Sequence, residues 1–443
     1  MFEFDASTVE ESASAEVAAL RAAGAKAGDS VGWLAWNDVR ALALLRACEQ
    51  LGLRYVPLNW RLALPELTAI ARHADLQLLW HDHALQSVAQ QVRSAAGLPL
   101  TPALGHRADD VMLVYTSGTA GAPKGAIHTA WAMRANIAAA IDAQGLNAAT
   151  RTLAVLPLFH VGGLCIQVLP TLAAGGRVRL HPRFDAGAWL RDVAAWRPST
   201  SLLVPATMRA LIEHPDWAST DLSSLAFVNA GSQVVPRDLI DAFHSRGVPV
   251  CQVYGATETG PVTLVLRPDE ARAHAGKVGR PARGVEVQLV DDEVWVRGEN
   301  LARGYHRDPE AAAFTGGWFR TGDLAHCDAR GLYEIVGRCS DVIISGGENI
   351  HPAEIEHLAL SDPAVAEAAA VGVPDPRWGE VPLLALVARP GMRVDVERLR
   401  NQLAGQLARY KQPRRIVVLE SLPKTALGKV QRALLAQSLV LPL

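Results

Sequence analysis

Between about Gly28 and Val262 the sequence alternates short apolar runs with longer stretches rich in alanine and leucine. The pairs are "SVGWLAWN" before "VRALALLRACEQLG", "VMLVYTS" before "HTAWAMRANIAAAI", and "SLLVPAT" before "MRALIEH". Apolar runs without polar alternation are typical of strands covered on both faces, and the helices between them supply the cover. We therefore predict a large layered α/β body with mainly parallel strands.

The pattern changes after about Gly276. In "GVEVQLVDDEVWVRG" apolar residues recur at every second position, which indicates strands with one wet face and a small β-barrel-like section. Further on, "VAEAAAVGVPD", "LLALVAR", "VERLRNQLAGQLARY" and "RIVVLE" are typical of strand, strand, helix and strand. We predict an N-terminal domain over residues 1–337 and a small α+β domain over residues 338–443.

The segment from Thr152 to Gly176 has no Asp, Glu, Lys or Arg over 25 residues, which is long enough to suggest a membrane span. Pro157, Pro170, His160 and two Gly-Gly pairs interrupt it. A buried strand, turn and helix accommodates such breakers better than a single long helix does. We therefore expect a core segment and no membrane span.

Charge and cysteine content indicate which binding partners and which cellular compartment to expect. The 43 Lys plus Arg and the 45 Asp plus Glu give a formal charge of −2, so no overall field attracts nucleic acid. The five cysteines are scattered without a C-x-x-C pair, and the acidic start "MFEFDASTVEES" differs from a signal peptide. We expect a cytoplasmic protein.

The stretch "VYTSGTAGAPKGA", Val114 to Ala126, combines a strand end, hydroxyl groups, glycines and a lysine, followed by a predicted helix. Backbone N–H groups in such an order can surround phosphate oxygens. The stretch is not a Walker A loop, because Pro123 precedes and Gly125 follows Lys124. A glycine-rich turn alone is more often a simple chain reversal, so other motifs must decide.

Other polar clusters lie far away in sequence. "VYGATETG" contains Tyr254 and Glu258, "RTGDLAHCDARGLYEIVGR" contains Asp323 and Arg338, and "LPKTALGKVQR" contains Lys429. Taken singly, each has a structural explanation as a core aromatic, a turn residue or a solvated charge.

Together, and in this order, the motifs resemble those of the adenylate-forming superfamily of acyl-CoA synthetases, nonribosomal-peptide adenylation domains and luciferases, over essentially the whole chain. The resemblance implies an ATP-dependent carboxylic acid–CoA ligase. Such an enzyme forms an acyl-adenylate and pyrophosphate, and then a thioester and AMP. It implies ATP, Mg²⁺ and coenzyme A as cofactors and co-substrates.

By this resemblance the nucleotide site draws on most of the quoted motifs. Tyr254 would stack on adenine, Asp323 and Arg338 would bind the ribose hydroxyls, and Lys429 would reach the α-phosphate. Glu258 would hold Mg²⁺. Thr119 is a second candidate ligand for Mg²⁺, and the implied catalytic residues are Lys429, His160 and Glu258. The implied ATP- and AMP-binding residues are Thr116, Ser117, Gly118, Thr119, Gly121, Lys124, Gly231, Ser232, Gln233, Tyr254, Gly255, Ala256, Thr257, Asp323 and Arg338.

The stretch "LPLFHVGG" indicates which class of carboxylic acid the enzyme would activate. Amino-acid-activating relatives place an Asp there to pair with the substrate ammonium, whereas this chain has His160. The resemblance therefore implies an aryl or aliphatic carboxylate, although an ordinary core histidine is the alternative. The implied acid pocket consists of His160, Val161, Gly162, Val228 and Gly231.

In this family the C-terminal domain rotates between the two half-reactions. By resemblance Ser345, Gly346 and Gly347 would line the coenzyme A tunnel, and Ser340 with Asp341 would form the hinge. The hinge departs from the family pattern, because Asp or Lys usually stands where this chain has Ser340. A hinge only absorbs a change of backbone torsion, so we retain the two-state prediction.

Other functions and partners stay open at this point. A stand-alone adenylation enzyme would load a carrier-protein phosphopantetheine instead of free CoA. A nucleotide-binding interaction protein would bind ATP without pyrophosphate exchange. The segment before "SVGWLAWN" is shorter than usual for the family. Either an opening subdomain is reduced, or a second subunit covers a sheet edge, so a homodimer is one expectation.

Overall fold

The computed structural model describes residues 2–98, 109–116, 124–232, 234–308, 311–345, 348–425 and 428–440. The chain divides into two compact units. Unit 1 consists of Met1–Gln288 and Trp295–Arg320, and unit 2 consists of Leu289–Val294 and Thr321–Leu443. The predicted domain boundary between residues 337 and 338 stays a prediction.

The larger sheet of unit 1 has eight strands. Its inner strands are parallel, whereas antiparallel pairs close its edges at β1–β8, β11–β12 and β12–β13. In spatial order the strands are β1 (Phe2–Phe4), β8 (Arg177–Leu180), β7 (Arg151–Ala154), β9 (Thr200–Leu203), β10 (Phe227–Gly231), β11 (Val250–Tyr254), β12 (Leu264–Val265) and β13 (Arg280–Pro281).

The second sheet of unit 1 has five strands. They are β4 (Leu76–His81), β2 (Ser30–Leu34), β3 (Arg54–Pro57), β5 (Asp110–Thr116) and β6 (Lys124–Thr129) in spatial order. The first four pair in parallel, and β6 returns antiparallel to β5. The prediction of mainly parallel strands is confirmed for both sheets.

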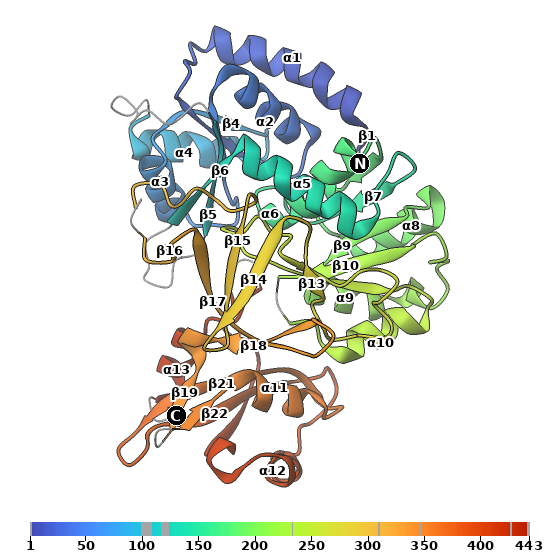
Figure 1. The fold of residues 1–443 in the computed structure, drawn as a ribbon, viewed down its shortest axis with the longest axis vertical. Coiled ribbons are helices and arrows are strands. Elements are labelled where there is room, and N and C mark those ends of the chain that lie inside the picture. Colours follow the sequence, from blue (N-terminus) through green and yellow to red (C-terminus); the bar gives the residue numbers. More distant parts are fainter. Residues whose placement is uncertain are drawn as a thin grey trace. The chain divides into compact units, whose positions relative to one another are not determined.

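Helices separate the parallel strands of unit 1, as the alternating sequence predicts (Figure 1). Several begin at an aspartate whose carboxylate accepts backbone N–H groups, for example Asp38 before α2 and Asp185 before α8. α1 packs along α2. The helices are α1 (Ala6–Ala22), α2 (Val39–Leu51), α3 (Leu64–His73), α4 (Gln86–Ala96), α5 (Ala130–Gln144), α8 (Ala186–Trp196), α9 (Pro205–Ile212) and α10 (Arg237–Ser245).

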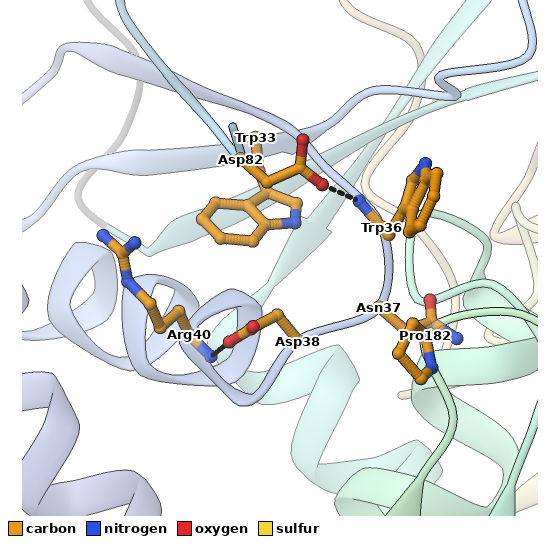
Figure 2. A pocket seen from close by; sticks show the side chains of 7 residues that line it. All are labelled: Trp33, Trp36, Asn37, Asp38, Arg40, Asp82 and Pro182. Carbon is orange, nitrogen blue, oxygen red and sulfur yellow. Dashed lines mark hydrogen bonds between the residues drawn. The ribbon is translucent and has the colours of Figure 1, made fainter. Parts of the chain in front are cut away.

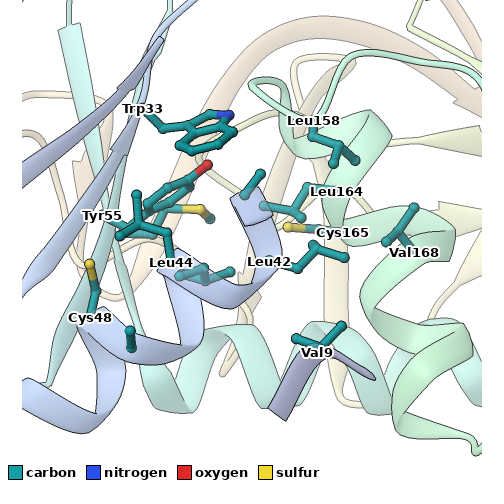
Figure 3. Close-up of a cluster of buried hydrophobic side chains, with 14 of the residues drawn as sticks. Val9, Trp33, Leu42, Leu44, Cys48, Tyr55, Leu158, Leu164, Cys165 and Val168 are labelled. Carbon is teal, nitrogen blue, oxygen red and sulfur yellow. The ribbon is translucent and has the colours of Figure 1, made fainter. Parts of the chain in front are cut away.

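The uncharged segment after Thr152 forms β7, α6 (Val161–Gly163), a π-helical turn (Leu164–Val168) and α7 (Leu169–Ala173). Figure 3 shows Leu158, Leu164 and Val168 from this segment packed toward Leu42 of α2 in one buried cluster. The prediction of a core strand, turn and helix is confirmed. Within the described residues, no helix is long and apolar enough to cross a membrane.

The period-two segment after Gly276 forms strands as predicted. Val294 and Val296 are fully buried, whereas Arg297, the next residue of the same strand, is exposed. The strands form a five-stranded sheet in the order β14 (Val285–Val290), β15 (Glu293–Gly298), β17 (Trp318–Cys327) and β16 (Phe314–Thr315), with β18 (Tyr333–Arg338) paired to β17.

Unit 2 is built on a sheet with helices on both faces. Along β21 and β22 alternate residues point to opposite faces, so Ala370 and Leu384 pack with α11 and α12, whereas Ala369 and Leu383 pack with α13. The predicted order strand, strand, helix and strand is confirmed by β21, β22, α12 and β23. The elements are β19 (Ile343–Ser345), β20 (Glu348–Ile350), α11 (Pro352–Leu360), β21 (Val365–Asp375), β22 (Gly379–Ala388), α12 (Val396–Gln406), β23 (Arg415–Leu419) and α13 (Arg432–Val440).

Candidate active site

The predicted phosphate loop connects two antiparallel strands. Thr116 at the end of β5 pairs with Lys124 at the start of β6. The predicted helix does follow the lysine, as α5, but residues 124–129 first form the unpredicted strand β6 and the helix begins only at Ala130. A Cβ on Gly125 would lie 2.8 Å from a Leu113 methyl group, so a larger residue there would displace the Leu113 side chain. Ser117, Gly118, Thr119 and Gly121 lie outside the described residues.

The carboxyl ends of β10 and β11 lie side by side, because the strands are parallel and Gly231 pairs with Val253. A Cβ on Gly231 would lie 2.3 Å from the Val253 carbonyl oxygen, so only glycine fits. Ser232 follows with a φ of +70°, a conformation that residues other than glycine rarely adopt. Such strain is concentrated at functional sites, which supports a ligand-binding role for this edge. Gln233 lies outside the described residues.

The turn after β11 carries the next predicted group of residues. Tyr254 ends the strand half-buried, and Thr257 and Glu258 are buried. A Cβ on Gly255 would lie 2.4 Å from the Pro261 carbonyl oxygen, so the turn closes on itself without space for a side chain. The Ala256 N–H donates to Thr259 Oγ1 at 2.9 Å. The structure thus brings Tyr254, Gly255, Ala256, Thr257 and Glu258 together in one tight turn.

Glu258 has a partner that the sequence motifs did not include. The Tyr305 hydroxyl donates to Glu258 Oε1 at 2.7 Å, and Lys124 Nζ lies 5.1 Å from the centroid of the Tyr305 ring. Burial and the neighbouring carboxylate raise the pKa of the Tyr305 hydroxyl, so it stays a donor at neutral pH. Two of the predicted residues, one assigned to phosphate and one to Mg²⁺, therefore contact the same tyrosine.

The predicted acid-pocket residues follow β7 and β10. His160 caps α6 and accepts the Gly162 N–H on Nδ1 at 3.1 Å. Burial lowers the pKa of His160 to about 4, so the ring is neutral and its other nitrogen carries the proton at pH 7. Val161 and Val228 are buried in apolar clusters. A neutral histidine among apolar side chains offers no counter-charge to a substrate ammonium.

In unit 2, Asp323 and Arg338 face each other on neighbouring strands. They are register partners in β17 and β18, and Arg338 Nε lies 2.6 Å from Asp323 Oδ1. The Asp323 side chain is buried, whereas Arg338 is partly exposed. The structure therefore brings together the two groups that were predicted to bind ribose hydroxyls.

Lys429 lies on a turn between Lys424 and Val430, which pair as an isolated bridge. The Thr425 N–H donates to the Lys429 carbonyl at 2.8 Å. Partial burial, and then the charge of Arg338, lower the pKa of the Lys429 ammonium, so this lysine lies near the Asp323–Arg338 pair. Three predicted residues that are far apart in sequence thus gather within unit 2.

An arginine that sequence reasoning missed lies at the start of α13, three residues after Lys429. Arg432 donates to Glu356 Oε2 at 3.1 Å and to the Ala370 carbonyl at 2.8 Å, and its Nε lies 3.1 Å from Asp341 Oδ2. Asp341 is one of the predicted hinge residues, and Ser340 Oγ lies 3.1 Å from its Oδ1. Arg432 therefore connects the lysine turn to the predicted hinge.

The predicted CoA-tunnel residues lie at the end of β19. Ser345 is buried and pairs with Glu348 of β20 and with Gly379 of β22. Gly346 and Gly347 lie outside the described residues. The CoA-tunnel assignment therefore stays a prediction.

A buried polar network beside the β5–β6 hairpin also escaped sequence reasoning. His73 Nδ1 lies 2.8 Å from the Tyr115 hydroxyl, and the His73 and His306 rings pack edge to face. Arg54 lies 3.3 Å from His306 Nδ1. Burial, followed by the charge of Arg54, lowers the pKa of His306 to about 4. This network fixes the strand that leads into the predicted phosphate loop.

A separate cavity of about 190 Å³ opens beside Trp33 and Trp36 (Figure 2). The two carboxylates at this cavity accept hydrogen bonds from the backbone: Asp38 from the Arg40 N–H and Asp82 from the Trp36 N–H. None of the predicted site residues lines it.

The chain is similar to known proteins over most of its length. The family model described as "AMP-binding enzyme" matches residues 7–306, and "AMP-binding enzyme C-terminal domain" matches residues 354–429. An indoleacetate–CoA ligase of Aromatoleum aromaticum is 40% identical over 94% of this chain and 89% of its own length. A feruloyl-CoA synthase of Amycolatopsis sp is 39% identical over 93% of this chain and 89% of its own length.

A solved structure is also similar over nearly the whole chain. It is the o-succinylbenzoate CoA synthetase (MenE) from Bacillus subtilis in complex with the acyl-adenylate intermediate OSB-AMP. The TM-score is 0.85 at 29% identity, and the match covers 96% of this chain and 92% of that one.

Proposed function

This chain belongs to the AMP-binding enzyme family, and from that premise we propose that it joins a carboxylic acid with an aromatic ring to coenzyme A. The enzyme is an AMP-forming acid–CoA ligase that uses ATP, Mg²⁺ and CoA. In the first step a carboxylate oxygen attacks the α-phosphorus of ATP and pyrophosphate leaves. In the second step the CoA sulfur attacks the acyl carbon, AMP leaves, and the thiol proton is released.

The observation that carries the proposed residue roles is the group formed by Asp323, Arg338 and Lys429. In our proposal the pair binds the ribose, and Lys429 stabilises the negative charge that gathers when one anion attacks another. Mg²⁺ supplies further neutralisation on the phosphates when it is bound. Lysine suits this role, because its compact charge sits on a flexible stem.

Two findings support an aromatic acid. The relatives at 40% and 39% identity are named for indoleacetate and ferulate, both of which carry an aromatic ring next to a short acid chain. His160, whose pKa is lowered to about 4, stays neutral and so does not select an amino acid by charge. The wall of the acid pocket is therefore proposed to be apolar, with His160, Val161 and Val228 beside the aromatic ring of the acid substrate.

The test is ATP–pyrophosphate exchange across matched acids, namely indoleacetate, ferulate, benzoate and decanoate, with the CoA thioester measured in parallel. We expect kcat/KM for the best aromatic acid to exceed that for decanoate by tenfold or more. A preference for decanoate would contradict the aromatic assignment. Exchange without thioester, together with acylation of a phosphopantetheinylated carrier, would favour the carrier-loading alternative.

Further properties complete the proposal. The five cysteines are unpaired, which agrees with a reducing cytoplasm. If the enzyme forms a homodimer, its average molecular mass in solution should rise with protein concentration toward twice the mass of one chain. The rotation of unit 2 about Ser340 and Asp341 between the half-reactions is part of the proposal, with Ser345, Gly346 and Gly347 at the CoA thiol.

A further inference from the structure

Tyr305 belongs to none of the motifs that predicted the site, yet it touches two of them. Its hydroxyl donates to Glu258 Oε1 at 2.7 Å, and its ring lies under Lys124 Nζ with 5.1 Å between the ammonium nitrogen and the ring centroid. Glu258 follows β11 of one sheet, and Lys124 begins β6 of the other. All three residues belong to unit 1.

The backbone around Tyr305 is fixed from both sides. On one side the Ala302 N–H donates to the Glu258 carbonyl at 2.8 Å. On the other side the His306 N–H donates to the Gly125 carbonyl at 2.7 Å, and Tyr305 itself bridges to Ala126. The ring is 7% exposed and packs edge-on against Phe314. Tyr305 therefore cannot change its position without breaking contacts to both neighbouring segments.

The Glu258 carboxylate fits a divalent cation. It is 8% exposed, Oε1 accepts the Tyr305 hydroxyl, and Oε2 accepts no hydrogen bond from the residues that the structure describes. A buried carboxylate without a cationic partner is costly. Carboxylate oxygens are the ligands that Mg²⁺ prefers, so Oε2 is the atom available to such an ion.

We propose that Tyr305 is a positioning residue that sets two nucleotide-binding groups relative to each other. Its hydroxyl fixes the carboxylate of Glu258 and leaves Oε2 to the metal, and its ring confines the ammonium of Lys124 by a cation–π contact. The inference rests on the proposed function, which assigns Glu258 to Mg²⁺ and Lys124 to the ATP phosphates. It explains why a tyrosine, rather than a phenylalanine, occupies this buried position.

Binding measurements separate the two roles of Tyr305. Mn²⁺ serves as the probe, and its binding is followed by electron paramagnetic resonance in the presence of a non-hydrolysable ATP analogue. Tyr305→Phe keeps the ring and removes the hydroxyl, so we expect Mn²⁺ affinity to fall about tenfold, as for other residues that orient a metal ligand. Binding of the analogue in EDTA should stay within twofold of wild type, because the cation–π contact remains.

Tyr305→Leu removes the ring as well. We expect it to show the Mn²⁺ defect and, in addition, to weaken binding of the analogue in EDTA by about two- to fivefold, the size of an exposed cation–π contact. Phe314→Leu is the packing control, since it loosens the edge of the same ring without touching the hydroxyl. Its Mn²⁺ affinity should match that of wild type. The melting temperature of each variant checks that it is folded.

Wild-type Mn²⁺ affinity in Tyr305→Phe, alongside lost affinity in Glu258→Gln, would overturn the positioning role. An equal Mn²⁺ defect in Phe314→Leu would also overturn it, because packing would then explain the effect. Thioester formation by the wild-type enzyme is measured separately, so a failure of the proposed function appears there and not in the Mn²⁺ titration.

Discussion

Unit 1 and unit 2 hold their predicted nucleotide-binding residues by different physical means. In unit 1, Gly231 and Gly255 bring carbonyl oxygens to within 2.3 Å and 2.4 Å of where a Cβ would lie, and Tyr305 connects Glu258 to Lys124. In unit 2, Lys429 lies on a turn next to Arg432, which pairs with Asp341 and Glu356. The first arrangement depends on close backbone packing, and the second on charge.

This difference indicates how each region should respond to change. A side-chain contact that is built on tightly packed backbone is pre-organised, so a substitution there should affect folding and nucleotide binding together. A lysine on a turn held by ion pairs should be replaceable without loss of fold, and its removal should affect the rate of one chemical step.

The largest effect is expected in unit 2. Lys429→Ala should lower ATP–pyrophosphate exchange by about 10²-fold or more, because it removes a charge that stabilises the transition state. ATP affinity should change only a few-fold. Lys424→Ala, in the same turn but paired with Glu367, is the matched control and should retain exchange. Near-normal exchange by Lys429→Ala would remove this residue from the mechanism.

The second effect concerns the backbone of unit 1. Gly255→Ala forces a Cβ against the Pro261 carbonyl oxygen, so we expect a loss of about 1–3 kcal/mol in unfolding free energy and weaker ATP binding. Gly405→Ala in α12 is the control, since that glycine faces open space inside a helix and should gain up to about 1 kcal/mol. Urea denaturation and nucleotide titration provide the readout. Equal stability of both variants would contradict the contrast.

A smaller effect is expected for the arginine that supports the lysine turn. Arg432→Met removes the contacts to Glu356 and Asp341, so exchange should fall about tenfold, which corresponds to about 1.4 kcal/mol in the barrier. Tm should fall as well, because the largely buried Glu356 carboxylate loses its cationic partner. Arg398→Met breaks a comparable ion pair with buried Asp362 and should leave exchange intact. If both variants lost activity equally, Arg432 would have no special relation to Lys429.

The smallest effect is the response to mild acid. Burial lowers the pKa of His128 to about 4, and His306, also in unit 1, is lowered to about the same value. Their unfolded pKa is about 6.5, so the unfolded chain binds more protons and acid favours unfolding. Stability is complete above about pH 6.5 and is lost as the pH falls toward 4.

Between pH 7 and pH 6 the loss should be under about 1 kcal/mol for each ring. Native-state hydrogen exchange, corrected for intrinsic rates, resolves it by region. Amides of β6, which carries His128, should lose protection before those of β22 in unit 2. The reverse order would show that acid acts mainly on unit 2.

Much of the fold followed from periodicity, because buried strands and their covering helices differ in pattern. β6 was missed, since the alanine-rich stretch after it dominates local propensity and only pairing with β5 shows residues 124–129 to be a strand. In retrospect Thr129, which caps α5, marks where that helix begins.

The motif residues of the site were predictable because their chemistry is specific. The supporting residues were not. Tyr305 and Arg432 act through partners far away in sequence, and a tyrosine after glycine or an arginine after glutamine carries no chemical signal of its own. The roles of all the motif residues stay predictions, and Ser117, Gly118, Thr119, Gly121, Gln233, Gly346 and Gly347 lie outside the described residues.

The most direct test of the account compares the two half-reactions in Lys429→Ala. Acyl-adenylate formation is followed by pyrophosphate exchange, and the second step is followed as thioester formation from supplied acyl-adenylate and CoA. The account predicts that the first falls by about 10²-fold or more while the second stays close to wild type. Equal loss of both half-reactions, or loss of the second alone, would contradict it.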